Sequence, residues 1–244
     1  SESGISNPQV VKDLQAVGKK YLTEKNRMIF TLMPEVETPK TDAPKAAVSA
    51  NVTAQQVIDN YAAALGGKYK LEAVKTVKTL STIKVMGMEM EATTLEMAPN
   101  KSKAVQKIMG QEMVQVFDGE KGYMMQAGQR MDLPAPAIEE AKKKRLFEVL
   151  SYNPADFKTV EKVTEEGKEL YLLAGAGKKL YFDTKTNLLV KSTSDKGDMV
   201  ILDYMEVDGI KFPKNLKLAM MGQNMEMTNN QVIVNKEVSA EDFK

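Results

Sequence analysis

From Lys75 to the C-terminus, apolar and polar residues alternate with a period of two, and turn-forming residues interrupt the alternation at short intervals. This periodicity is typical of β-strands that bury one face. Short strands joined by turns of two to about five residues pair as antiparallel hairpins. The turn signals are Gly87, Pro99-Asn100, Gly110, Asp118-Gly119, Gly128, Glu166-Gly167, Asp183 to Asn187, Gly197, Asp208-Gly209 and Gly222. The sequence therefore predicts one large antiparallel meander.

Two amphipathic helices are expected beside the strands. Thr53 and Gln56 have the spacing of a capping box, and Gly66-Gly67 marks the helix end. A second helix is expected over residues 134–150, with the basic run 142–145 as a solvated face. A sheet of this size must cover its apolar face, and these helices are available to do so. We predict an α+β fold in which a strongly curved antiparallel sheet, an incomplete barrel, wraps amphipathic helices.

Three regions are expected along the chain. Residues 1–33 are predicted to form a helix and then a strand, and residues 34–50 carry three prolines and read as an extended linker. Residues 51–244 are predicted to form the curved-sheet domain. The chain is expected to be a piece of a longer protein.

Composition removes several classes of function. The chain of 244 residues has no histidine and no cysteine, which excludes Ser-His-Asp and Cys-His catalysis and zinc sites built on those residues. The net charge of +1 gives no field that would attract nucleic acid, and no apolar stretch approaches the ~20 residues of a membrane span. Ser81 and Lys84 form an S-x-x-K match inside a strand pattern, where that catalytic serine does not occur. We expect no enzymatic activity, catalytic residue, metal site or cofactor in this chain.

The 17 methionines are the unusual feature that remains, and many follow the strand period. In IKVMGMEME and LAMMGQNMEM, methionines recur at every second position, and QEMVQVF places one more on a strand face. The residues that we expect to bind a ligand are Met86, Met88, Met90, Met113, Met221, Met225 and Met227.

Three interpretations of these methionines stay open. They form an ordinary hydrophobic core, or they line a cavity for acyl chains, because methionine adapts to flexible apolar guests. Alternatively, their thioethers bind Cu(I). A carrier without histidine would need a partner or a conformational change to release its ligand.

Most of the chain resembles the outer-membrane lipoprotein-sorting (LolA/LolB-like) superfamily. The resemblance covers residues 53–244 and rests on ALGGKYKLEAVKT, VFDGEKGYMM, LYFDTKTNLLVKS and DYMEVDGIKFPKNLKL. It implies a half-barrel with a hydrophobic cavity for a lipid or acylated ligand. It also implies a soluble protein of the periplasm or outer cell envelope of a Gram-negative bacterium.

The first segment, VVKDLQAVGKKYLTEKNRMIFTLMPE, is similar to the C-terminal end of pitrilysin/insulinase-type zinc peptidases. This resemblance implies a peptidase-like region upstream in the same polypeptide. It leaves a second function open, in which this chain is an accessory region of a zinc peptidase and the sheet face serves only as core.

Overall fold

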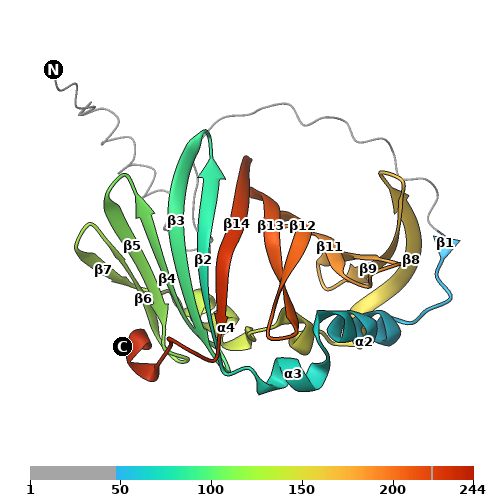
Figure 1. Ribbon diagram of the computed structural model, residues 1–244, viewed down its shortest axis with the longest axis horizontal. Coiled ribbons are helices and arrows are strands. Elements are labelled where there is room, and N and C mark those ends of the chain that lie inside the picture. Colours follow the sequence, from blue (N-terminus) through green and yellow to red (C-terminus); the bar gives the residue numbers. More distant parts are fainter. Residues whose placement is uncertain (1–47, 221) are drawn as a thin grey trace.

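The computed structural model describes residues 48–220 and 222–244, and Figure 1 shows them as one curved antiparallel sheet with a few short helices. Within these residues, 14 strands hydrogen-bond in the order β1-β8-β9-β10-β11-β12-β13-β14-β2-β3-β4-β5-β6-β7. The strands are β1 (Val48–Ser49), β2 (Thr76–Val85), β3 (Met88–Met97), β4 (Lys101–Ile108), β5 (Gln111–Phe117), β6 (Gly122–Gln126), β7 (Gln129–Asp132), β8 (Phe157–Glu165), β9 (Lys168–Gly175), β10 (Lys178–Asp183), β11 (Leu189–Ser194), β12 (Gly197–Val207), β13 (Ile210–Met220) and β14 (Gln223–Val234).

The sheet consists of two runs of sequential strands that pair with each other at one point. β2 to β7 follow one another in sequence, as do β8 to β14, and the two runs join where β14 pairs with β2. The sheet does not close, because β7 and β1 lie at its two ends. β1 pairs with β8 through Val48 and Lys162, so the sheet begins inside the region 34–50 that we expected to be linker.

Helix α2 (Ala54–Leu65) forms as expected. The Thr53 hydroxyl accepts from the Gln56 backbone N–H, and the Gln56 side chain accepts from the Thr53 N–H, which completes the capping box. Gly66 ends the helix with φ of 139°, and a Cβ there would lie 2.6 Å from the Gly209 carbonyl oxygen. Glycine is therefore required where α2 meets the β12–β13 turn. The short helix α3 (Lys68–Ala73) follows.

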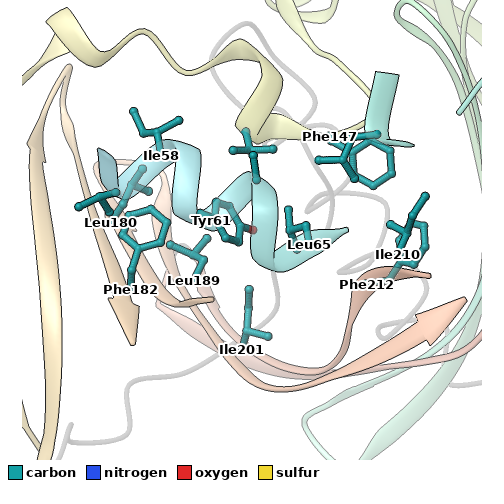
Figure 2. Packing of buried hydrophobic residues seen from close by; sticks show 14 of the residues in the cluster. Ile58, Tyr61, Leu65, Phe147, Leu180, Phe182, Leu189, Ile201, Ile210 and Phe212 are labelled. Atoms are coloured by element: carbon teal, nitrogen blue, oxygen red, sulfur yellow. The ribbon is translucent and has the colours of Figure 1, made fainter. Parts of the chain in front are cut away.

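The main hydrophobic core lies between α2 and one face of the sheet (Figure 2). Tyr61 of α2 packs edge-on against Phe182, with ring centroids 5.2 Å apart. Phe182 and Leu173 are 0% exposed. We call this set the helix-covered core, and its large members are Val57, Ile58, Tyr61, Leu65, Leu71, Phe147, Phe157, Leu173, Leu180, Phe182, Leu189, Ile201, Ile210, Phe212 and Leu216.

The single helix expected over 134–150 is wrong in its length. Helix α4 (Ala135–Lys143) stops at Lys144, whose ψ of 151° is extended, and a short 3-10 turn, η1 (Glu148–Ser151), follows. The break lets Phe147 reach the helix-covered core, where its ring lies 5.7 Å from that of Phe212. Burial of an aromatic side chain outweighs the few backbone hydrogen bonds of a longer helix.

The predicted curved, open antiparallel sheet is therefore confirmed, but the helical share was overestimated. The remaining helical turns are η2 (Pro154–Asp156) and η3 (Ala240–Phe243). The described chain is mostly sheet, with α2 as its one helix of more than nine residues.

Candidate functional site

One face of the sheet, which we call the inner face, carries the helix-covered core and continues beyond the helices. Cross-strand partners in a sheet share a face, so the pairing register traces it. From Leu216 in the helix-covered core, the register runs through Met227 and Ile83 to Met90. The inner face therefore extends from the core under α2 to strands β2, β3 and β4.

A second hydrophobic cluster occupies this extension, and we call it the methionine cluster. Its buried members are Ile83, Val85, Met90, Ala92 and Met225. Ile108, Leu218, Met220 and Met227 pack around them, and Met227 also contacts the helix-covered core. The two clusters form one continuous apolar surface, but none of α2, α3 and α4 contributes a residue to the methionine cluster.

The structure brings together most of the methionines that the sequence singled out. Met88 pairs with Val85, Met90 with Ile83, and Val85 and Ile83 pair in turn with Met225 and Met227. Met113 lies two strands further along the same face, opposite Gln106.

Two of the predicted ligand-binding methionines are not in this group. Met86 does not continue the strand, because it sits in the β2–β3 turn with φ of 51° and is 51% exposed. The turn breaks the two-residue period, so position 86 no longer shares a face with positions 88 and 90. Met221 lies outside the described residues.

Charge is distributed unevenly between the two faces. In β2, β4 and the adjoining part of β13, the register places the lysines on the outer face: Lys78, Lys84, Lys101, Lys103, Lys107 and Lys217. There Lys217, Glu226, Lys84 and Glu89 face one another across four strands, which gives a ladder of alternating charge. The inner face of the same strands carries aliphatic residues and methionine together with uncharged polar residues.

Glu96 of β3 is a charged residue on the inner face, where it pairs with Val77, also a member of the helix-covered core. Burial raises the pKa of the Glu96 carboxyl above its ordinary value, and the positive charge of Lys144 partly offsets this. A carboxyl whose pKa is raised in the folded protein opposes folding once it is ionised.

We therefore expect Glu96→Gln to stabilise the protein at pH 7. The penalty is present above the ordinary pKa of the carboxyl and vanishes when Glu96 is protonated in both the folded and the unfolded protein. The added stability of Glu96→Gln should therefore disappear as the pH falls below about 4. Urea denaturation of both proteins at pH 7 and pH 4 measures this, and a variant less stable than the wild type at pH 7 would contradict it.

Two buried glutamines on the inner face escaped the sequence analysis. Gln106 is 8% exposed and Gln223 is 5% exposed. The Oε1 atom of Gln106 and both the Oε1 and Nε2 atoms of Gln223 have no hydrogen-bond partner. Strand parity in KSKAVQKI would have placed Gln106 on the same face as Ile108, but no sequence rule indicates that a glutamine lacks a partner.

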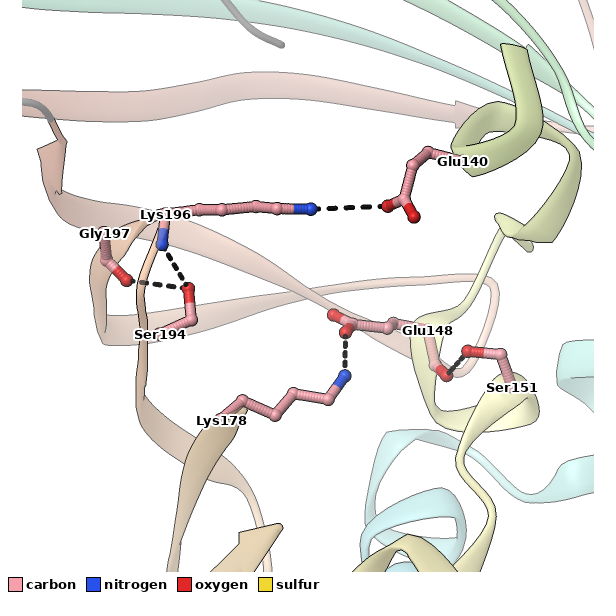
Figure 3. A network of polar contacts seen from close by, with 7 residues as sticks. All are labelled: Glu140, Glu148, Ser151, Lys178, Ser194, Lys196 and Gly197. Atoms are coloured by element: carbon pink, nitrogen blue, oxygen red, sulfur yellow. Dashed lines mark hydrogen bonds and ion pairs between the residues drawn. The ribbon is translucent and has the colours of Figure 1, made fainter. Parts of the chain in front are cut away.

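Besides the buried side chains of Phe147 and Val149, two ion pairs fasten the segment from α4 to η1 to the sheet (Figure 3). Glu140 of α4 pairs with Lys196 in the β11–β12 turn at 3.3 Å, and Glu148 of η1 pairs with Lys178 of β10 at 3.2 Å. Exposed pairs of this kind contribute roughly 0–1 kcal/mol each. α4 itself buries only Ala137 and Ala141, so its attachment is weak compared with that of α2.

A depression of about 370 Å³ touches the methionine cluster at Leu218 and Met225, and its other lining residues are Asp198, Val200, Lys217, Ala219, Asn224 and Glu226. Another, of about 420 Å³, lies away from the cluster and is lined by Lys101, Asp118, Glu120, Lys121, Ala240, Phe243 and Lys244. Its charged rim does not suit an acyl chain. Met90 and Met225 are themselves only 4% and 5% exposed, so the methionine cluster is closed over in this conformation.

The described residues contain no group of three or more histidine, cysteine, aspartate or glutamate side chains placed to hold a metal ion. Among the helices that the structure describes, none is long and apolar enough to cross a membrane.

Comparison with known proteins relates the chain to others through its fold. No protein-family model and no curated protein sequence matches it. A DUF1329 family protein from Desulfovibrio piger superposes with a TM-score of 0.51 at 8% identity, over 78% of this chain and 97% of that one. A domain of an outer membrane lipoprotein-sorting protein from Vibrio parahaemolyticus gives a TM-score of 0.51 at 10% identity, with the same coverage. The chain therefore shares its fold with a lipoprotein-sorting domain, as the sequence resemblance implied.

Proposed function

We propose that this protein is a non-catalytic domain of the cell envelope that binds a lipid or acylated ligand on the inner face of its sheet. The observation that carries the proposal is the methionine cluster, which extends the helix-covered core along the inner face and contains no residue of a described helix. A chain of about 14 methylenes could yield at most about 11 kcal/mol on burial, and ordering reduces that to the moderate affinity of a carrier.

The closed state of the cluster is compatible with binding. Methionine has three flexible torsions and a polarisable sulfur, so its side chain rearranges around an apolar guest at low cost. The fold shared with the lipoprotein-sorting domain from Vibrio parahaemolyticus supports the same function and a place in the periplasm or outer envelope. The proposed ligand-contacting residues are Met88, Met90, Met113, Met225 and Met227.

Binding of the neutral fluorescent probe N-phenyl-1-naphthylamine tests the proposal. We expect saturable binding to the full chain, and we expect Met88→Lys to weaken it about tenfold, or about 1.4 kcal/mol. Met88 is 43% exposed at the rim of the inner face, so the variant should fold. Met86→Lys is the matched control, because Met86 is similarly exposed but lies in the turn, and it should bind within about twofold of the wild type.

Absence of saturable probe binding to the wild-type chain would refute the proposal. So would equal weakening by the Met86 and Met88 variants, since the effect would then follow from added charge alone.

Cu(I) binding is a second candidate, because Met90, Met220, Met225 and Met227 belong to one cluster. A Cu(I) titration under reducing conditions decides it: failure to compete with a weak chelator excludes the site. The peptidase-like segment 1–33 lies outside the described residues, and its role as part of a zinc peptidase stays a prediction without a matching relative.

A further inference from the structure

All the buried side-chain nitrogen and oxygen atoms without a partner, among the residues that the structure describes, belong to Gln106 and Gln223. Both glutamines border the methionine cluster. Gln106 pairs with Ala92, a buried member of the cluster, and Gln223 pairs with Met220, which packs against it. β4 and β14 lie on opposite sides of β2 and β3, so one carboxamide flanks the cluster from each side.

Such a placement is costly for the protein alone. A buried polar group left without a hydrogen bond costs about 1–3 kcal/mol, and native proteins carry few such groups. Leucine or methionine at either position would fill similar space without this cost. The three unpartnered carboxamide atoms at one apolar cluster therefore indicate hydrogen bonds that form when a ligand is present.

The chemistry of these atoms describes what they would bind. The Gln106 oxygen needs a donor, and Gln223 offers both an acceptor and a donor. The lysines of β2 and β4 lie on the outer face, and the inner face of β3 carries a carboxylate, Glu96. This environment disfavours an anionic head group such as a carboxylate or phosphate.

We propose that Gln106 and Gln223 are the polar contacts of the acyl-ligand site. Its ligand is a neutral acylated molecule that carries amide or hydroxyl groups beside the chain. An N-acyl amide and a monoacylglycerol share this chemistry, since each offers a hydrogen-bond donor and a carbonyl acceptor next to the first methylenes. The inference rests on the proposed function and specifies the class of ligand.

Isothermal titration of the full chain with 1-monopalmitoylglycerol, N-palmitoylethanolamine and palmitate, each below its aggregation limit, tests this. We expect the two neutral ligands to bind at least tenfold more tightly than palmitate at pH 8. Gln106→Leu and Gln223→Leu should each weaken the neutral ligands about tenfold. If one neutral ligand binds more tightly than the other, that result identifies whether the ligand of this protein is an N-acyl amide or a monoacylglycerol.

A matched control separates polar contact from packing. Gln115 lies on the same inner face, opposite Ala104 and two register rows from Gln106, but its side chain has no buried unpartnered atom, so Gln115→Leu should bind within about twofold of the wild type. Gln106→Leu and Gln223→Leu should also melt at or above the wild-type temperature, because each removes an unsatisfied buried group.

Two results would overturn the inference. One is palmitate binding as tightly as the neutral ligands, and the other is unchanged affinity in both glutamine variants. If N-phenyl-1-naphthylamine still binds in either case, the apolar site stands and only the head-group assignment fails.

Discussion

Raising the pH from 9 to 12 is expected to destabilise this protein, with a loss of about 2 kcal/mol from Tyr61 alone. Burial raises the pKa of Tyr61 to about 12, with a smaller opposing effect of the Tyr204 hydroxyl. The unfolded chain loses the phenolic proton near pH 10, whereas the folded protein keeps it to about pH 12. The contribution of Tyr61 to stability is therefore constant below about pH 9 and falls as the pH rises through this window.

Two neighbouring tyrosines should steepen the loss. Burial also raises the pKa of Tyr204 and that of Tyr152, and ionisation of any one would place a negative charge beside the others. The Tyr204 hydroxyl donates to the Leu189 carbonyl at 2.7 Å, so that residue is held in the core in its neutral form. Guanidinium denaturation at pH 9, 10, 11 and 12 measures the dependence.

The matched variants are Tyr61→Phe and Tyr69→Phe. Tyr61→Phe should flatten the decline above pH 10, whereas Tyr69 is 86% exposed and its replacement should leave the profile unchanged. A free energy of unfolding that stays constant from pH 9 to 12 would contradict the prediction.

The sheet could be predicted from the sequence because its determinants are local. Each turn signal, such as Asp118-Gly119 or Asp208-Gly209, fixes one hairpin, and successive hairpins build the meander without long-range information. The capping box at Thr53 likewise specifies the start of α2. The same reasoning placed Met88, Met90, Met225 and Met227 on common faces, and the register then joined those faces.

Other features depend on contacts between distant residues and were missed. Phe147 breaks the predicted helix because Phe212, 65 positions later, offers it a buried site. Met86 leaves the strand because the β2–β3 turn needs a residue with positive φ. Neither the pairing of β14 with β2 nor the missing partners of Gln106 and Gln223 can be read from periodicity, since both are set by what lies across the sheet.

Phe182→Ala is expected to cost about 3–5 kcal/mol, the loss typical of a buried aromatic side chain that leaves a cavity. The side chain is 0% exposed and packs edge-on against Tyr61. Its neighbours are rigid, because they include β-branched and aromatic residues of α2 and the sheet that cannot collapse into the space. Urea denaturation at pH 7 provides the measurement.

Met90→Ala is the informative comparison, because Met90 is also buried, at 4% exposed, but lies in the methionine cluster. If the cluster is an adaptable binding surface, the flexible side chains of Met225 and Met227 should partly fill the gap and limit the cost to about 1–2 kcal/mol. The variant should also bind N-phenyl-1-naphthylamine more weakly, whereas Phe182→Ala should change probe affinity only through unfolding. If Met90→Ala costs as much as Phe182→Ala and the wild-type chain binds no probe, the methionines are simply core, and the inner face has a structural role alone.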